Sequence, residues 1–313
     1  MTDGRVEKVQ EIDGSARIAS NCANVLGESP VWSAREQALY WTDIREPALY
    51  RLEVATGKTE TWPMPELAGA VVLRESGGVI VCLQSGLYAF SPDTERLEAI
   101  LIFERDHPDD RANDSRCDRE GRQECGISGS PHRAIYCLDA ALQPVRMVAG
   151  LSVPNAICFS PAGDRLYFAD TKTGALEVAS LERATATTTE RRALLADGRV
   201  PGKPDGATVD VEGFICIARF GGGCLVRCAP DGRVDAILRL PVTNPTSCSF
   251  GSRDLDRLYI TTARQRLSPE ALAGEPMAGA LLVVEPGVKG LEEPAFRGCR
   301  LSLHATAPDG VAS

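Results

Sequence analysis

Apolar and polar residues alternate with a period of two along most of the chain, which is the pattern of half-buried β-strands. Three segments are near-copies of one strand, and each follows a polar turn: ALYWTD (38–43), RLYFAD (165–170) and RLYITT (257–262). A second strand recurs in a looser form: ALYRLE (48–53), GLYAFS (86–91), AIYCLD (134–139), ALEVAS (175–180) and CLVRCAP (224–230). Because turns rich in Gly, Asp and Pro separate these runs, the pattern predicts an all-β chain built from repeats.

Particular residues recur at one phase of this repeat, each just before or within an apolar strand. They are Glu28 in LGESPVW, Gly69, Asn113 in RANDSRCD, Asn155 in VPNAICFSP, Asp205 in KPDGATVD, and Ser247. Their separations of 41 to 50 residues are typical of propeller blades with about four strands each. We therefore predict a six-bladed β-propeller of four-stranded antiparallel blades, a single domain over residues 1–313. Since the innermost strand of each blade starts at the axis, these side chains should converge there.

Two further elements follow from local signals. The N-terminal segment, residues 6–19, alternates like a strand and is expected to complete the last blade, thereby closing the ring. A short helix is predicted after Ser268, with Pro269 at its first position and an end at Gly274 and Pro276.

Composition narrows the function classes. The net charge of −9 is spread through the turns and forms no basic stripe, which argues against a nucleic-acid partner. No apolar run approaches the length of a membrane span, and the polar N-terminus does not resemble a secretory signal. Most of the 11 cysteines lie inside strand patterns, as expected in a reducing cytoplasm. We expect a cytoplasmic monomer or weak homo-oligomer without a membrane partner.

Several catalytic chemistries lack their motifs. The chain has three histidines and contains no HExxH, no GxSxG and no Gly-rich phosphate loop. Cys224 and Cys228 have no second Cys or His pair nearby, so a zinc site there is not favoured. Carboxylate and amide oxygens remain, and these are the ligands of a hard divalent cation.

Each candidate residue also fits an ordinary turn when it is considered alone. Glu28 precedes Ser-Pro, Asn155 follows a proline, Asp205 lies in Lys-Pro-Asp-Gly, and Arg111 and Asn113 lie in the loop-like sequence RAND. Their common phase in the repeat favours one shared axial site over unrelated turns.

The chain resembles the senescence-marker-protein/gluconolactonase/regucalcin family of six-bladed propellers, from Leu26 to about Val284. The segments that carry the resemblance are LGESPVW, RAND-x-x-CD-x-x-GR, PNAICFSPAGDRLYFADT, PDGATVDVEG and PTSCSFGSRDLDRLYITTA. The resemblance implies hydrolysis of a sugar lactone.

The resemblance also implies roles for individual residues. Glu28, Asn155 and Asp205 would be ligands of one divalent metal, Asp205 would also be the general base, and Arg111 and Asn113 would contact the substrate. The oxygen ligands do not select among Ca²⁺, Mg²⁺, Mn²⁺, Zn²⁺ and Fe²⁺.

The sequence departs from the family pattern at positions that we expect to shape the pocket. These positions are Ser115, Gln123 and Glu124, Cys216, and the short loop 128–132, where His132 is an alternative substrate contact. Two other functions stay open at this point: an organophosphate or ester hydrolase on the same metal, and a non-catalytic propeller that binds calcium or a protein partner.

Overall fold

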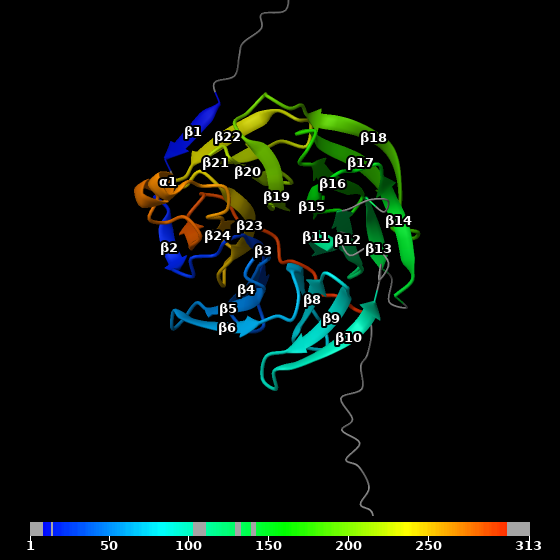
Figure 1. Ribbon diagram of the computed structural model, residues 1–313. Coiled ribbons are helices and arrows are strands. Elements are labelled where there is room, and N and C mark those ends of the chain that lie inside the picture. The colour runs from blue at the N-terminus through cyan, green and yellow to red at the C-terminus, as the bar shows by residue number, and fades with distance from the viewer. Residues whose placement is uncertain (1–8, 14, 103–110, 129–132, 139–141, 299–313) are drawn as a thin grey trace, which may run out of the picture.

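The computed structural model describes residues 9–13, 15–102, 111–128, 133–138 and 142–298. Its strands form six sheets that stand around one axis as the blades of a propeller (Figure 1). Each blade has four antiparallel strands. The predicted fold class is therefore confirmed.

The blades are numbered along the chain. Blade 1 comprises β3 (Gly27–Ser33), β4 (Ala38–Asp43), β5 (Ala48–Glu53) and β6 (Lys58–Pro63). Blade 2 comprises β7 (Ala68–Leu73), β8 (Val79–Leu83), β9 (Gly86–Ser91) and β10 (Arg96–Ile102). Blade 3 comprises β11 (Arg111–Cys117), β12 (Gln123–Ser128), β13 (Ala134–Leu138) and β14 (Pro144–Ala149).

The second half of the chain repeats this order. Blade 4 comprises β15 (Pro154–Phe159), β16 (Arg165–Asp170), β17 (Leu176–Glu182) and β18 (Thr187–Leu195). Blade 5 comprises β19 (Lys203–Val209), β20 (Ile215–Phe220), β21 (Cys224–Cys228) and β22 (Val234–Arg239). Blade 6 comprises β23 (Pro245–Gly251), β24 (Arg257–Thr262), β25 (Leu281–Val284) and the N-terminal β2 (Arg17–Ser20). The strands nearest the axis are β3, β7, β11, β15, β19 and β23.

The N-terminal segment closes the ring, but it does so with two strands on two blades. As predicted, β2 pairs antiparallel with β25 and completes blade 6. The preceding strand β1 (Gln10–Asp13) instead pairs in parallel with β22, as a fifth strand at the outer edge of blade 5. The expectation that the whole segment belongs to the last blade was therefore wrong. An unpaired edge strand of the neighbouring blade offers backbone groups to any extended segment nearby.

The predicted helix is present. Helix α1 (Pro269–Gly274) starts after Ser268, whose side-chain oxygen accepts a hydrogen bond of 3.2 Å from the Ala271 amide. Among the described residues, no helix has the length and apolarity needed to cross a membrane.

The core consists of apolar layers between neighbouring blades. Trp32 of blade 1 and Tyr259 of blade 6 stack there, with ring centroids 6.3 Å apart. Cys224 and Cys228 lie in the apolar cluster between blades 4 and 5, and the nine cysteines whose side chains the structure describes have free thiols. Cysteine thus serves as a small apolar residue in these layers.

All six innermost strands carry a register irregularity at the same place, near their N-terminal ends. The irregularities lie at Glu28–Val31, Ala68–Ala70, Ala112–Asp114, Asn155–Cys158, Pro204–Ala207 and Pro245–Ser247. In two of them the residue after the polar side chain has a positive φ, 51° at Ser29 and 54° at Ala156. A bulge turns a side chain away from its regular direction. The fixed phase of the polar residues in the sequence therefore has a structural cause.

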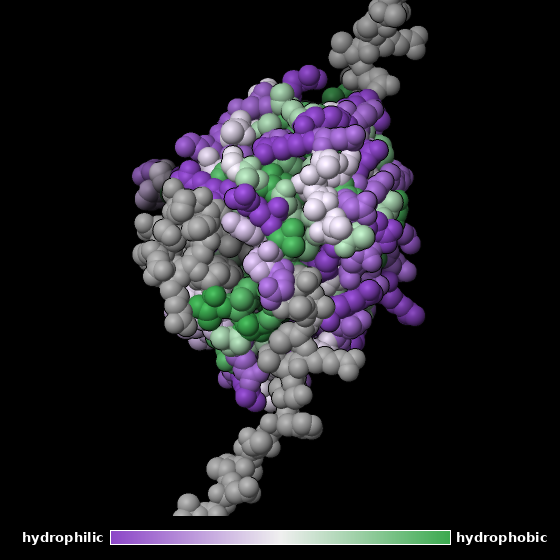
Figure 2. All heavy atoms as spheres, turned by 90° about the vertical axis from the view of Figure 1, so that its right-hand side faces the viewer, coloured by the Kyte–Doolittle hydropathy of each residue, from purple (hydrophilic) through white to green (hydrophobic). Residues whose placement is uncertain are grey.

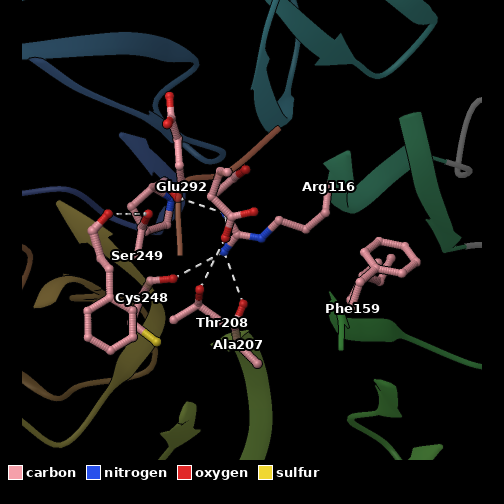
Figure 3. Close-up of polar contacts among 12 residues, drawn as sticks. Arg116, Phe159, Ala207, Thr208, Cys248, Ser249 and Glu292 are labelled. Atoms are coloured by element: carbon pink, nitrogen blue, oxygen red, sulfur yellow. Dashed lines mark hydrogen bonds and ion pairs between the residues drawn. The ribbon is translucent and has the colours of Figure 1, made fainter. Parts of the chain in front are cut away.

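At the opposite end of the axis, Arg116 and a C-terminal segment join the blades. Arg116 donates to the carbonyl oxygens of Pro30 (3.0 Å), Ala207 (3.1 Å) and Cys248 (3.1 Å), which belong to three different blades (Figure 3). Residues 289–297 run past the turns of blades 5, 6, 2 and 3 at this end, with backbone hydrogen bonds to each. From this segment Glu293 approaches the Arg116 guanidinium to 3.9 Å.

The outward side of the molecule is mainly hydrophilic. Figure 2 shows the side that lies on the right in Figure 1, where hydrophilic residues predominate and one patch of hydrophobic residues lies in the lower part of the view. The outer strand β18 fits this picture, because Glu190, Arg191 and Arg192 are all exposed. Charged residues on an outer strand discourage pairing with another molecule.

Candidate functional site

The predicted site residues come together at the end of the axis where the innermost strands begin. Glu28 lies on β3, Asn113 on β11, Asn155 on β15 and Asp205 on β19 (Figure 1). These side chains belong to residues that are only 8%, 8%, 5% and 6% exposed, respectively. Residues that are up to 177 positions apart in the sequence are thus neighbours, because each blade contributes the same position of its inner strand.

A chain of hydrogen bonds links three of these residues. The Asn113 amide nitrogen donates to Asn155 Oδ1 (2.8 Å) and to the Pro154 carbonyl oxygen (2.9 Å). The Asn155 amide nitrogen donates in turn to Asp205 Oδ1 (2.7 Å) and to the Thr171 hydroxyl oxygen (2.8 Å). Asn113, Asn155 and Asp205 belong to three successive blades, so the side chain of Asn155 is held by hydrogen bonds from both neighbouring blades.

Electrostatics at the site is dominated by buried carboxylates. Burial raises the pKa of Glu28 well above its usual range, and the charges of Asp205 and Asp114 raise it further. Burial also raises the pKa of Asp205 well above its usual range, again with a contribution from Asp114, while Arg111 and Arg266 oppose this rise. The site therefore disfavours its own negative charge, which is the condition under which a cation binds strongly.

Arg111 brings positive charge to the same place. Burial lowers the pKa of its guanidinium to about 10, and the nearby Arg45 lowers it too, whereas Glu28 and Asp205 act in the opposite direction. Arg45 and Arg266 also act on this site, so the carboxylates of Glu28, Asp205 and Asp114 are faced by positive charge from three guanidiniums.

The donor set fits a hard divalent cation. Glu28 and Asp205 supply carboxylate oxygens and Asn155 supplies an amide oxygen. A group of three or more His, Cys, Asp or Glu side chains suited to a metal does not occur within the described residues, because the third donor here is an amide. The negative charges of Glu28 and Asp205 repel each other, and a bound cation would relieve this repulsion.

Two contributors were not singled out from the sequence. Asp114 accepts a hydrogen bond from the Ile157 amide (2.9 Å), which ties blade 3 to the bulge of blade 4, and it acts on the pKa of both metal-ligand candidates. Thr171 accepts from Asn155 and donates to the Pro204 carbonyl oxygen (2.9 Å). Asp114 lies within the RAND motif, so its position was visible, whereas Thr171 reaches the site from another loop.

The described residues that depart from the family pattern do not line this site. Ser115 and Gln123 are buried and hydrogen-bonded to each other (3.2 Å), and Cys216 belongs to the apolar cluster between blades 5 and 6. Glu124 is fully buried and lies opposite Arg116 and Cys137 in the sheet, towards the other end of the blade. The expectation that these four positions shape the pocket was wrong, because they pack between blades. The loop residue His132 lies outside the described residues.

A cleft of about 1010 Å³ occurs elsewhere, between blades 1 and 2, with Arg51 and Arg74 in its wall. It lies at the end of the blades opposite to Glu28, and none of the four motif residues lines it. The chemistry-bearing residues, and not this cleft, define the candidate site.

Comparison with known proteins identifies the family of this chain. The model of the SMP-30/gluconolactonase/LRE-like region matches residues 26–264, which include all the candidate site residues. The chain belongs to this family. A 6-deoxy-6-sulfogluconolactonase of Pseudomonas putida is 36% identical over 279 residues, which cover 88% of this chain and 96% of that protein. An L-arabinolactonase of Azospirillum brasilense is 32% identical and covers 91% and 96% of the two chains.

A solved structure shares the architecture of this SMP-30/gluconolactonase/LRE-like protein. The calcium-binding protein regucalcin from Agrobacterium tumefaciens has a TM-score of 0.88 at 28% sequence identity. The match covers 93% of this chain and 100% of the regucalcin chain. The two proteins therefore share the same overall fold.

Proposed function

We propose that this protein hydrolyses the lactone of a sugar acid, and that Glu28, Asn155 and Asp205 hold one divalent cation at the catalytic site. Relatives named as lactonases, at up to 36% identity over nearly the full length, support the reaction class. The observation that carries the cation is the pair of buried carboxylates, each of which has a raised pKa, together with the Asn155 side-chain amide that is hydrogen-bonded to Asp205.

The donor geometry sets one requirement. In the structure Asn155 points its amide nitrogen at Asp205 and its oxygen at Asn113. Ligation through the oxygen requires the amide to turn over, after which Asn113 still bonds the Pro154 carbonyl oxygen. Asn113 therefore holds the Asn155 amide in the orientation seen without a cation, and it is also a candidate substrate contact.

The reaction needs a base, an acid and a stabilised oxyanion. A bound cation supplies Lewis-acid polarisation of the lactone carbonyl. Asp205, when ionised, accepts a proton from the water that adds to this carbonyl carbon. When the ring C–O bond breaks, the protonated Asp205 returns the proton to the departing ring oxygen. The new carboxylic acid then ionises and releases one proton to the solution.

The other residues orient the substrate. Arg111 is half-buried beside Glu28 and Asp205, and its fork of N–H donors suits ring hydroxyls and the carbonyl oxygen of a lactone. Glu28 carries negative charge without an obvious proton to transfer, so its role is to bind the cation.

Hydrolysis of a lactone releases acid, which gives a direct assay. Protein stripped of metal should be inactive and should regain activity when Ca²⁺, Mg²⁺, Mn²⁺, Zn²⁺ or Fe²⁺ is added. A pH indicator would follow turnover of a panel of pentonolactones and hexonolactones, with a phosphotriester and a simple aryl ester beside them. Preference for a lactone supports the proposal. Turnover of the phosphotriester alone, or activity that does not depend on any cation, contradicts it.

A further inference from the structure

A small apolar cluster fixes the loops at the site end of the axis. Its buried members are Leu26, Ile44 and Ala263, and Leu67 and Phe220 pack against it. These residues come from loops or strand ends of blades 1, 2, 5 and 6, and Leu26 lies two positions before Glu28. The cluster is separate from the layers between the blades, so it holds the rim of the site and not the blade cores.

Backbone hydrogen bonds hold the loop that carries Arg45 at this rim. The Asp43 carboxylate accepts hydrogen bonds from the backbone amides of Val25 (2.7 Å), Leu26 (3.1 Å) and Arg45 (2.9 Å). The same carboxylate thus ties the segment that leads into Glu28 to the loop that carries Arg45. The Arg45 Nε donates to the Gln265 side-chain oxygen (3.0 Å), which points the guanidinium towards the loop of blade 6.

The loop that carries Arg266 is hydrogen-bonded to the same segment, which leads into Glu28. The backbone amide of Gln265 donates to the Val25 carbonyl oxygen (2.9 Å), and the Asn244 side chain donates to the Gln265 carbonyl oxygen (3.0 Å). Arg266 has a φ of 66°, and its guanidinium carbon lies 5.7 Å from the centre of the Phe220 ring. Phe220 in turn pairs with Lys203, two residues before Asp205.

Both guanidiniums act on the site, although neither is neutralised locally. In the described part of the chain, no carboxylate forms an ion pair with Arg45 or Arg266, and Glu46 on the same loop is not within pairing distance. Arg45 follows Ile44 of the rim cluster, and Arg266 contacts Phe220, which packs against the same cluster. Leu26 of this cluster lies two positions before Glu28, and Phe220 pairs with Lys203, two positions before Asp205, so both arginines lie beside the strand ends that carry the site carboxylates. The protein as a whole has a net charge of −9, so two arginines beside the site that have no carboxylate partner among the described residues are a local exception to its negative charge.

We propose that the substrate is a sugar lactone with an anionic group, a phosphate, sulfonate or carboxylate, at the end remote from the lactone carbonyl, and that Arg45 and Arg266 bind this group. The inference rests on the proposed function, because that function places the carbonyl at Glu28, Asn155 and Asp205 and leaves the rim for the remote end. A guanidinium offers two parallel N–H donors that match such an oxyanion. Gln265 and Phe220 hold the two guanidiniums in place before the ligand arrives.

The test compares 6-phosphogluconolactone with gluconolactone, which lacks only the charged group. The ratio of their kcat/KM values is measured for the wild type, Arg45→Gln, Arg266→Gln and the double variant. We expect the wild type to favour the anionic lactone, and each single variant to lower the ratio by about 10-fold and the double variant by about 100-fold. Rising salt should lower the wild-type ratio, because screening weakens contacts at a solvent-exposed rim. Arg253→Gln is the matched control, since Arg253 is exposed on a turn at the opposite end of the blade and should not change the ratio.

Two outcomes separate this inference from the proposed function. If gluconolactone is hydrolysed but the ratio favours no anionic lactone, or the double variant leaves it unchanged, the inference is overturned and the lactonase proposal stands. If neither lactone is hydrolysed, the lactonase proposal fails, and calorimetry with 6-phosphogluconate and gluconate decides about the rim. Tighter binding of 6-phosphogluconate that is lost in the double variant supports an oxyanion site, and equal binding overturns it.

Discussion

The substitution Asp205→Asn should move stability and activity in opposite directions. Asp205 is 6% exposed, and burial together with Asp114 raises its pKa well above the usual range. A carboxyl with a raised pKa stabilises the fold at low pH and loses that contribution as the pH rises through its folded pKa. Metal-free wild type should therefore lose stability as the pH rises from the ordinary titration range of an aspartate, about pH 4, to the raised pKa of Asp205 in the folded protein. Asparagine has no such proton to lose and keeps an oxygen for the bond from Asn155.

The size of the effect follows from the buried charge. Removal of an uncompensated buried carboxylate should stabilise the metal-free protein by about 1–3 kcal/mol near pH 8. The unfolding entropy of about 2.1 cal/mol/K per residue gives roughly 0.7 kcal/mol/K for 313 residues. The melting temperature should then rise by roughly 2–5 °C in a chelator.

Added cation should reverse the order of the two proteins. Wild type gains stability in proportion to RT ln(1 + [cation]/Kd), whereas the variant has lost one charged ligand and gains less. At saturating cation, turnover of the variant should still be lower by about 10²–10⁴-fold, because the general base is missing.

Scanning fluorimetry across pH, with and without cation, measures the crossing directly. The control is Asp170→Asn, because Asp170 accepts backbone hydrogen bonds from Ser152 (2.8 Å), Val153 (3.0 Å) and Lys172 (3.1 Å). This chemically identical change should destabilise the protein with or without cation. An Asp205→Asn protein that melts below wild type in chelator at every pH would refute the reasoning, and near-wild-type turnover in excess cation would reduce Asp205 to a ligand.

Three other predictions test separate parts of the structure. Arg111→Ala and Asn113→Ala should each lower kcat/KM by the equivalent of about 1–3 kcal/mol with cation affinity kept, because each variant loses a hydrogen bond to the substrate; unchanged kinetics in both variants would contradict this. Deletion of residues through Ser20 removes β1 and β2 and should cause aggregation or a much lower melting temperature, and a soluble truncation with normal melting would disprove the closure. Glu124→Met should stabilise the protein by about 1–3 kcal/mol in urea unfolding, more at high pH than at low pH, because burial raises the pKa of this carboxyl well above its usual range and the opposing contributions of Cys137 and Arg122 are smaller; a loss of stability would contradict this.

Repetition made the fold predictable from the sequence. Near-identical strands fixed the blade length, and the residues Glu28, Asn113, Asn155 and Asp205 marked the inner strand of four blades, which the structure confirms. The helix after Ser268 was predictable too, since capping is a local interaction. Local and periodic signals were sufficient wherever each repeat obeys the same rule.

Features that occur once in the ring were not predictable in this way. The parallel pairing of β1 with β22 depends on an open edge that no sequence period reveals. A glutamate usually lies at the surface, but Glu124 is buried because its strand is covered on both faces. Arg45 and Arg266 approach the site through loops of different blades, so their proximity needed the folded ring.

The way the ring closes has a consequence for the synthesis of the protein. Strand β2 leaves the ribosome before β25, its partner in blade 6, and about 260 residues lie between them. At typical elongation rates this is a delay on the order of tens of seconds. Blades 1 to 4 can form within consecutive stretches of the nascent chain, but the first-made strands must wait for the last. During that interval β1 and β2 are unpaired strands on the growing chain, and unpaired strands are the segments of a nascent chain that are most exposed to aggregation.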